Sequence, residues 1–231
     1  MNLPPVVFLH GFATSSERTW RDTGWVDIFT DEGRETHLID ILGHGDAPKP
    51  ADPQAYANLE DWVWERLPKG QLPEGQLDAV GFSMGGHLLL GLASKFPERF
   101  RRLVVAGVGN NVFRHDIEHR QMVRQAIAGD APPDNPVAQH FSFLASSPEA
   151  DRQALSAFLQ REGTAMTPQT LATLTCPVLV IFGDQDFAGP VEPLVEALPN
   201  ATLKILPGVD HFATPKNFGC IEAAVNWLCE T

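Results

Sequence analysis

The sequence lacks long apolar runs and has few cysteines. Its longest apolar runs, such as residues 6–9 and 178–182, fall well short of the ~18 residues that a membrane span needs. The first residues contain no basic segment and no long apolar stretch, so we expect no secretory signal. Three cysteines are too few for a disulfide framework and are expected to be buried thiols. These absences predict a cytoplasmic protein that does not contact a membrane.

Basic residues are also scarce. There are 17 lysines and arginines against 29 acidic residues, a formal charge of −12. Such a surface repels phosphate backbones, which argues against nucleic acid as a partner. What the chain does contain is ordinary for a folded protein, with 43% apolar and 20% charged residues. This composition excludes intrinsic disorder.

Six short apolar runs alternate with longer helical patterns. Consecutive apolar residues within each run are typical of parallel strands that are covered on both faces. Strands are predicted at residues 5–10, 36–41, 77–83, 101–108, 177–184 and 201–208. Helices are predicted near residues 25–32, 59–67, 84–96, 191–198 and 218–229. This alternation predicts an α/β fold with a mostly parallel sheet of about six strands and helices on both faces.

Residues 109–172 break the alternation. No strand pattern occurs there, and helical patterns are interrupted at Gly129 and at several prolines. A segment of this length is too long for a plain connection. We therefore expect a small helical lid, inserted after the fourth strand, on a core made of residues 1–108 and 173–231.

The sequence Gly81-Phe82-Ser83-Met84-Gly85 matches the G-x-S-x-G motif of a nucleophile elbow. It follows a predicted strand and opens a predicted helix, which is the context that the motif requires. A sharp turn there would hold the Ser83 hydroxyl clear of the sheet, and glycine would avoid side-chain clashes. The free N–H groups at the start of the helix would face a developing oxyanion. Ser83 is therefore predicted to be a nucleophile.

A serine nucleophile needs a base and an orienting carboxylate. His211 follows the last predicted strand, and loops at the carboxyl ends of parallel strands converge on one crevice. We expect His10 and His44 to shape loops and His87 to be a packing residue. The fifth predicted strand ends at Asp184, with Asp186 two residues on, and either acid could orient His211. A carboxylate at the very end of the strand would more often cap the turn, so position in the loop favours Asp186.

The chain resembles the α/β-hydrolase superfamily in motifs that appear in the family's order and cover nearly the whole sequence. They occupy residues 10–12, 40–45, 81–86, 183–186 and 208–212. Among its members, carboxylesterases, enol-lactonases and cofactor-free haloperoxidases look most similar. The resemblance implies a reduced core that begins at the family's third strand. It also implies that Asp186 is the acid, that the backbone N–H groups of Phe12 and Met84 form the oxyanion hole, and that no cofactor or metal takes part.

Two other patterns need interpretation. His115 and His119 fit the H-x-x-E-H metal motif, but they lie among arginines in a segment typical of a solvated helix face. Aromatic side chains in the first loop and the lid are candidates to line an apolar substrate pocket, with burial in the lid's own core as the alternative. These candidates are Phe12, Trp20, Phe141, Phe143 and Phe158.

These observations favour a serine hydrolase that cleaves a small carboxylic ester through an acyl-enzyme, with Ser83, His211 and Asp186 as the triad. Two alternatives stay open. One is a lyase of the menaquinone-pathway type or a carbon–carbon hydrolase that uses the same triad. The other is a ligand-binding relative without turnover. The sequence leaves the natural ester and the oligomeric state open.

Overall fold

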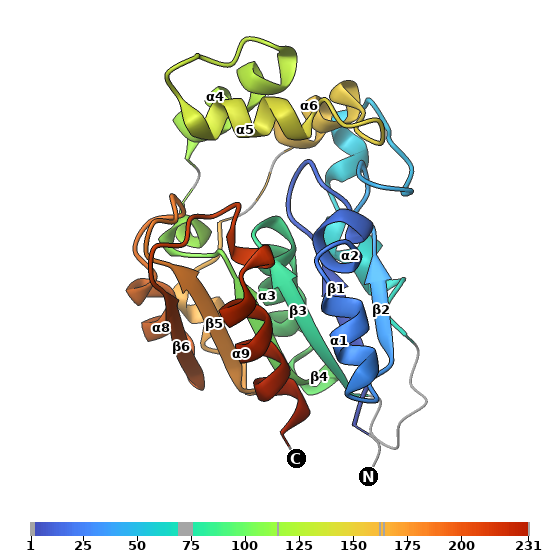
Figure 1. The fold of residues 1–231 in the computed structure, drawn as a ribbon, viewed down its shortest axis with the longest axis vertical. Helices are drawn as coiled ribbons and strands as arrows, with labels where there is room; N and C mark the ends of the chain where they lie inside the picture. The colour runs from blue at the N-terminus through green and yellow to red at the C-terminus, as the bar shows by residue number, and fades with distance from the viewer. Residues whose placement is uncertain (1–2, 69–75, 115, 162, 164, 231) are drawn as a thin grey trace.

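Six strands form one sheet in the computed structural model, which describes residues 3–68, 76–114, 116–161, 163 and 165–230. All strand pairs are parallel, in the order β2-β1-β3-β4-β5-β6 (Figure 1). The strands are β1 (Val6–Leu9), β2 (Thr36–Ile39), β3 (Leu77–Phe82), β4 (Phe100–Ala106), β5 (Val178–Gly183) and β6 (Ala201–Leu206). The predicted α/β fold and sheet are confirmed. Each strand ends one or two residues earlier than predicted, because the final residues of each run enter the following loop.

Helices cover both faces of the sheet. Alternation within β1 sends Val6 and Phe8 to one face and Val7 and Leu9 to the other. The first face packs against α1 (Trp25–Asp31) and α9 (Phe218–Cys229). The opposite face packs against α2 (Leu59–Trp64), α3 (Met84–Lys95) and α8 (Glu192–Ala197). Two apolar cores therefore hold the sheet rigidly from either side.

A buried ion-pair network closes the amino end of the sheet. Asp78 in β3 is fully buried and accepts from Arg34 and from Arg101, whose Nε and Nη2 lie 3.0 and 2.6 Å from its carboxylate oxygens. Arg34 also donates to the backbone oxygens of Pro4 and Leu228. Through these bonds the two guanidinium groups tie β3 to the chain that precedes β1 and to α9.

Among the described residues, four α-helices lie between β4 and β5, after a short 3-10 helix at Asn110–Phe113. Of these, α4 (Ile117–Ala128), α5 (Pro136–Leu144) and α6 (Arg152–Gln160) form a layer beyond the carboxyl ends of the strands (Figure 1). These three are called the lid helices below. The fourth, α7 (Pro168–Leu171), packs beside α3 and α8 instead.

Each lid helix begins at a side-chain cap. Asp116, Asn135 and Asp151 accept hydrogen bonds from backbone N–H groups in the first turns of α4, α5 and α6. The lid helices share a small apolar core that also includes Ala13 from the loop after β1. This contact fixes the layer over the carboxyl end of the sheet. Within the described residues, no helix is both long enough and apolar enough to span a membrane.

Candidate active site

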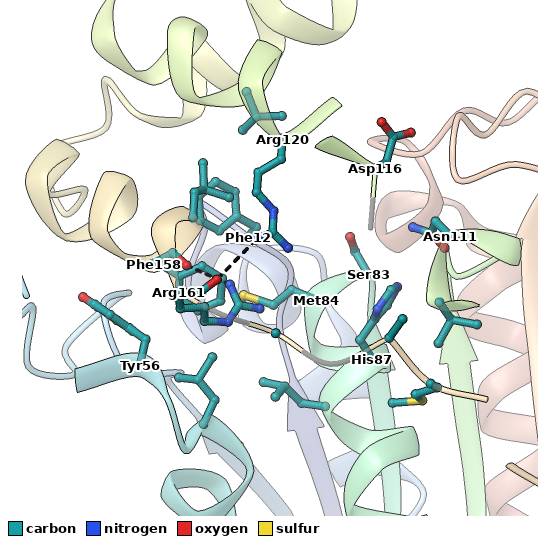
Figure 2. Close-up of a pocket in the computed structure, with 18 of the residues that line it drawn as sticks. Phe12, Tyr56, Ser83, Met84, His87, Asn111, Asp116, Arg120, Phe158 and Arg161 are labelled. Atoms are coloured by element: carbon teal, nitrogen blue, oxygen red, sulfur yellow. Dashed lines mark hydrogen bonds between the residues drawn. The ribbon is translucent and has the colours of Figure 1, made fainter. Parts of the chain in front are cut away.

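Ser83 occupies the sharp turn between β3 and α3. Its backbone has φ 51° and ψ −115°, a strained conformation for a residue with a side chain. A Cβ on Gly81 would lie 2.7 Å from the Gly85 oxygen, and a Cβ on Gly85 would lie 2.2 Å from the Leu9 oxygen. Only glycine fits at either position, which explains the spacing of the G-x-S-x-G motif. The turn presents the Ser83 hydroxyl to a cavity above the sheet (Figure 2).

His211 links Ser83 to Asp186. Its Nε2 lies 3.0 Å from the Ser83 Oγ, and its Nδ1 lies 2.9 Å from both carboxylate oxygens of Asp186. The Asp186 side chain is fully buried, and an ionised carboxylate only accepts hydrogen bonds. Nδ1 therefore carries the ring proton, which leaves the Nε2 lone pair facing the serine hydroxyl. Phe82 and Phe187 pack against the imidazole with ring centroids 4.9 and 4.3 Å away.

The two aspartates after β5 have different contacts. Asp184 is exposed, and its Oδ1 accepts from the Gly208 N–H at 2.7 Å, which joins the loops after β5 and β6. Asp186 Oδ1 accepts from the Ala188 N–H at 2.8 Å, and this bond fixes the carboxylate against His211. The structure thus brings Asp186, and not Asp184, to the histidine.

Two backbone N–H groups next to Ser83 are free to donate. Phe12 lies in the loop after β1, and Met84 is the first residue of α3. Within the described part of the chain, neither N–H donates to another protein group. His10 holds the loop after β1 in place. Its Nδ1 lies 2.7 Å from the Gly11 oxygen, and its Nε2 accepts from the Ile41 N–H at 3.0 Å. The N–H groups of Phe12 and Met84 are therefore available to a ligand bound beside Ser83.

Asp40 ties the loops after β1 and β2 together. Its two carboxylate oxygens accept from the backbone N–H groups of Ser16 and Asp46, both at 2.8 Å. Burial by itself raises the pKa of Asp40, but these hydrogen bonds outweigh it and hold the pKa below its ordinary value. The bonded residue Ser16 lies three positions after Ala13, a non-glycine residue with φ 58° directly after Phe12.

Three more histidines lie near the site in neutral form. Burial lowers the pKa of His10 below 6.5. Burial, and then the neighbouring His10, lowers the pKa of His44 to about 3. Burial, and then the charge of Arg161, lowers the pKa of His87 to about 4. At neutral pH these rings therefore shape the site without carrying charge.

Two cavities meet at Ser83. The larger, of about 560 Å³, is lined by Phe12 and Met84 but not by His211 (Figure 2). The smaller, of about 420 Å³, is lined by His211 and by residues of the loop after β1. Both lie between the sheet's carboxyl end and the lid helices. Phe12 lines both cavities, whereas Met84 lines only the larger of the two and His211 only the smaller.

Comparisons with known proteins agree with this arrangement. Residues 4–131, more than half of the chain, match the family model described as alpha/beta hydrolase fold. The chain belongs to the alpha/beta hydrolase family. This confirms the resemblance drawn from the motifs, and the protein is a hydrolase of that fold.

Curated relatives of the hydrolase include esterases and lactonases. A pimeloyl-[acyl-carrier protein] methyl ester esterase of Nitrosomonas europaea is 28% identical over 96% of both chains. The 3-oxoadipate enol-lactonase 2 of Acinetobacter baylyi is 30% identical over 80% of this chain and 76% of its own. The solved structure of a bromoperoxidase from Bacillus anthracis has a TM-score of 0.73 at 20% identity, covering 99% of this chain and 93% of that one. The structural match shows the shared fold.

Three of the five aromatic residues predicted for the substrate pocket line the larger cavity of the hydrolase: Phe12, Phe141 and Phe158. The other two predictions are wrong. Trp20 is fully buried on the sheet's α1 face against Phe8 and Trp25, since the short helix Glu17–Arg21 turns it back onto the core. Phe143 is 67% exposed because two residues along α5 rotate it about 200° from Phe141.

The candidate metal motif gains no support from its geometry. His115 lies outside the described residues. The ring of His119 packs against Phe141 and Phe187 at centroid distances of 6.1 and 5.1 Å. In the described part of the chain, no three acidic, histidine or cysteine side chains cluster as metal ligands would.

Sequence reasoning missed three residues that line the larger cavity. His87, predicted as a packing residue, lies one helical turn after Ser83. Arg120 was assigned to a solvated helix face, and Arg161 was not singled out, yet both line the cavity. A signal was present for Arg120, because it is spaced three and seven residues from Val123 and Ile127, the buried stripe of α4.

Proposed function

We propose that this hydrolase cleaves small carboxylic esters by serine catalysis through an acyl-enzyme. The observation that carries the proposal is the continuous path from the Ser83 Oγ to His211 at 3.0 Å and on to Asp186 at 2.9 Å. A second support is the pair of free N–H groups beside Ser83. Curated relatives that are named as an esterase and an enol-lactonase favour the same class of substrate.

In the first step, the Ser83 Oγ attacks the ester carbonyl carbon while His211 Nε2 accepts the hydroxyl proton. Asp186 holds the ring by its Nδ1–H bond and stabilises the imidazolium that forms. The N–H groups of Phe12 and Met84 donate to the carbonyl oxygen as it becomes negative. His211 then protonates the leaving alkoxide, and the acyl group stays on Ser83. Water repeats the sequence and releases the acid.

The two cavities suit the two parts of an ester. The leaving alcohol must lie near His211, because the imidazolium protonates it. The 420 Å³ cavity, which His211 lines, is therefore assigned to the alcohol. The acyl chain extends away from the histidine on the side of Met84, into the 560 Å³ cavity. The larger space thus selects the acid part of the substrate.

Ser83→Ala tests the proposal directly. Hydrolysis of a short-chain p-nitrophenyl ester should fall by at least ~10⁴-fold, since triad members act as a unit. A fluorophosphonate probe should label Ser83 in the wild type and leave the variant unlabelled. Ser94→Ala is the matched control, because this serine lies on the same helix and its hydroxyl donates to the Leu90 oxygen at 2.9 Å, away from His211.

The proposal is wrong if folded Ser83→Ala retains wild-type turnover, or if the probe labels another residue while ester hydrolysis proceeds. If no ester is hydrolysed but Ser83 is labelled normally, the enzyme instead cleaves another kind of bond, such as a carbon–carbon bond, with the same serine.

A further inference from the structure

Two arginines from different lid segments meet in the larger cavity. Arg120 projects from α4, and Arg161 directly follows α6; both line the cavity that also contains Ser83 and Met84 (Figure 2). Arg120 Nη1 donates to the backbone oxygen of Arg161 at 3.3 Å. The Arg161 guanidinium is held in turn by the Phe158 oxygen, 2.9 Å from its Nη1, and by the Phe158 ring, whose centroid lies 3.8 Å from its Cζ. Both side chains are therefore fixed in place.

Neither guanidinium has an acidic partner in the described part of the chain. No carboxylate there forms an ion pair with Arg120 or Arg161. Burial, followed by the charge of Arg120, lowers the pKa of Arg161 to about 10. Both residues are partly exposed, and two like charges held close together repel each other, a repulsion that a bound anion relieves. The pair therefore favours an anionic group at this part of the cavity.

The charge of Arg161 acts on a residue close to Ser83. Arg161 is among the causes that lower the pKa of His87, which lies one helical turn from Ser83. Met84, an oxyanion donor in the proposed mechanism, lines the same cavity. The pair therefore faces the space assigned above to the acyl chain.

Among the described residues, the other charged side chains that line the cavity form no ion pair with either arginine. Glu60 is paired with Lys95 on the α2 side, away from the lid helices. Asp116 is exposed and caps α4, where its Oδ1 accepts from the His119 N–H at 2.8 Å. Asp61 and Arg114 are exposed at the cavity's outer parts. An acyl chain that lies along Phe141 and Phe158 would therefore meet the charges of the two arginines.

We propose that Arg120 and Arg161 bind an anionic group, most simply a carboxylate, on the acyl part of the substrate. The preferred substrate is then a half-ester of a dicarboxylic acid, with its ester carbonyl at Ser83 and its free carboxylate on the arginine pair. Guanidinium groups suit this role because their N–H donors match the two oxygens of a carboxylate. This inference rests on the proposed function, whose acyl side it specifies.

A substrate series tests the inference. Monomethyl esters of linear dicarboxylic acids, from succinate to suberate, are compared with methyl esters of monocarboxylic acids of the same length. At one length, kcat/KM for the half-ester should exceed that for its neutral partner by about 10- to 100-fold, the range of a charge-assisted contact. The preference should weaken as salt is raised, because screening reduces the attraction.

Arg161→Gln and Arg120→Gln should each remove most of this preference while the protein stays folded by circular dichroism. Arg124→Gln is the matched control, since Arg124 lies one turn further along α4, is exposed and does not line this cavity. Calorimetric binding of the preferred half-ester to Ser83→Ala gives a readout without turnover. Its Kd should rise by about 10- to 100-fold when Arg161→Gln is added.

The possible failures are distinguishable. If neutral esters and half-esters are cleaved equally and Ser83 is labelled, the anion site is wrong and the hydrolase mechanism stands. If no ester is cleaved and Ser83 is not labelled, the proposed function is wrong, and calorimetry on the unchanged protein still decides whether the arginine pair binds the half-ester. A preference that survives both substitutions also overturns the inference.

Discussion

Arginine pairs lie at both ends of the sheet, and the two pairs differ in their partners. At the amino end, Arg34 and Arg101 share the fully buried Asp78. At the carboxyl end, Arg120 and Arg161 line a cavity, and within the described residues no carboxylate pairs with them. A charge that is satisfied inside the chain contributes to holding strands together. A fixed charge that is left without a partner beside a nucleophile is available to a ligand.

The largest expected effect is a loss of activity, with little loss of stability, from a substitution at the carboxyl end of the sheet. Asp186→Asn preserves the shape of the acid but favours the wrong imidazole tautomer of His211, so kcat should fall by ~10⁴-fold, the cost of such a change in a well-studied serine protease triad. The folding free energy should change little by comparison. Asp184→Asn is the control, since Asp184 contacts the Gly208 N–H and not the histidine. The opposite ranking of the two variants would show that the acid is assigned to the wrong residue.

The next largest effect is a loss of stability, with little loss of activity, from a substitution at the amino end of the sheet. Asp78→Asn leaves two guanidinium groups without their counter-charge inside the protein, which typically costs about 3–5 kcal/mol of unfolding free energy. Urea unfolding measures the loss. Turnover per fluorophosphonate-labelled site should stay near that of the wild type, because Asp78 lies at the end of β3 opposite Ser83. A loss of turnover per labelled site, with the unfolding free energy unchanged, would show that Asp78 serves catalysis and not stability, and would contradict the comparison of the two ends.

Much of the fold follows from the sequence because local patterns determine it. Consecutive apolar residues identified all six strands, and the motif glycines located the turn at Ser83. The geometry of His211 and Asp186 also agrees with their assigned positions, since loops after parallel strands share one edge. Position in the loop favoured Asp186 over Asp184, but the backbone of the loop decides which carboxylate faces the histidine.

The lid was harder to predict, because its side chains are placed by packing between distant segments. Trp20 and Phe143 have the aromatic character of pocket residues, yet the first packs under the loop and the second faces solvent. Arg120 and Arg161 were hidden for the opposite reason. Charged residues on a lid segment suggest a solvated surface, and only the fold brings α4 and the end of α6 together at the cavity.

The smallest expected effect is a pH dependence of stability that originates at the carboxyl end. His44 is 2% exposed, its Nδ1 lies 3.2 Å from the Leu42 oxygen, and its ring packs against Phe12 and Phe158. Burial, and then His10, lowers the pKa of His44 from 6.5 to about 3 in the folded protein. Below pH 6.5 the unfolded chain therefore binds a proton that the folded protein refuses, and stability falls as the pH decreases.

This residue alone should lower the unfolding free energy by about 2 kcal/mol between pH 7.5 and pH 5, because the unfolded histidine becomes charged over that range while the folded one stays neutral. His44→Asn keeps a donor for the Leu42 oxygen and removes the titration, so its loss over the same range should be smaller by that amount. Each variant is compared with itself at two pH values, so any uniform destabilisation by the substitution cancels. Ser94→Ala, which changes no titratable group and removes only a hydroxyl on α3, is the control and should lose as much stability as the wild type. Equal losses for His44→Asn and the wild type would mean that His44 does not resist protonation in the folded state.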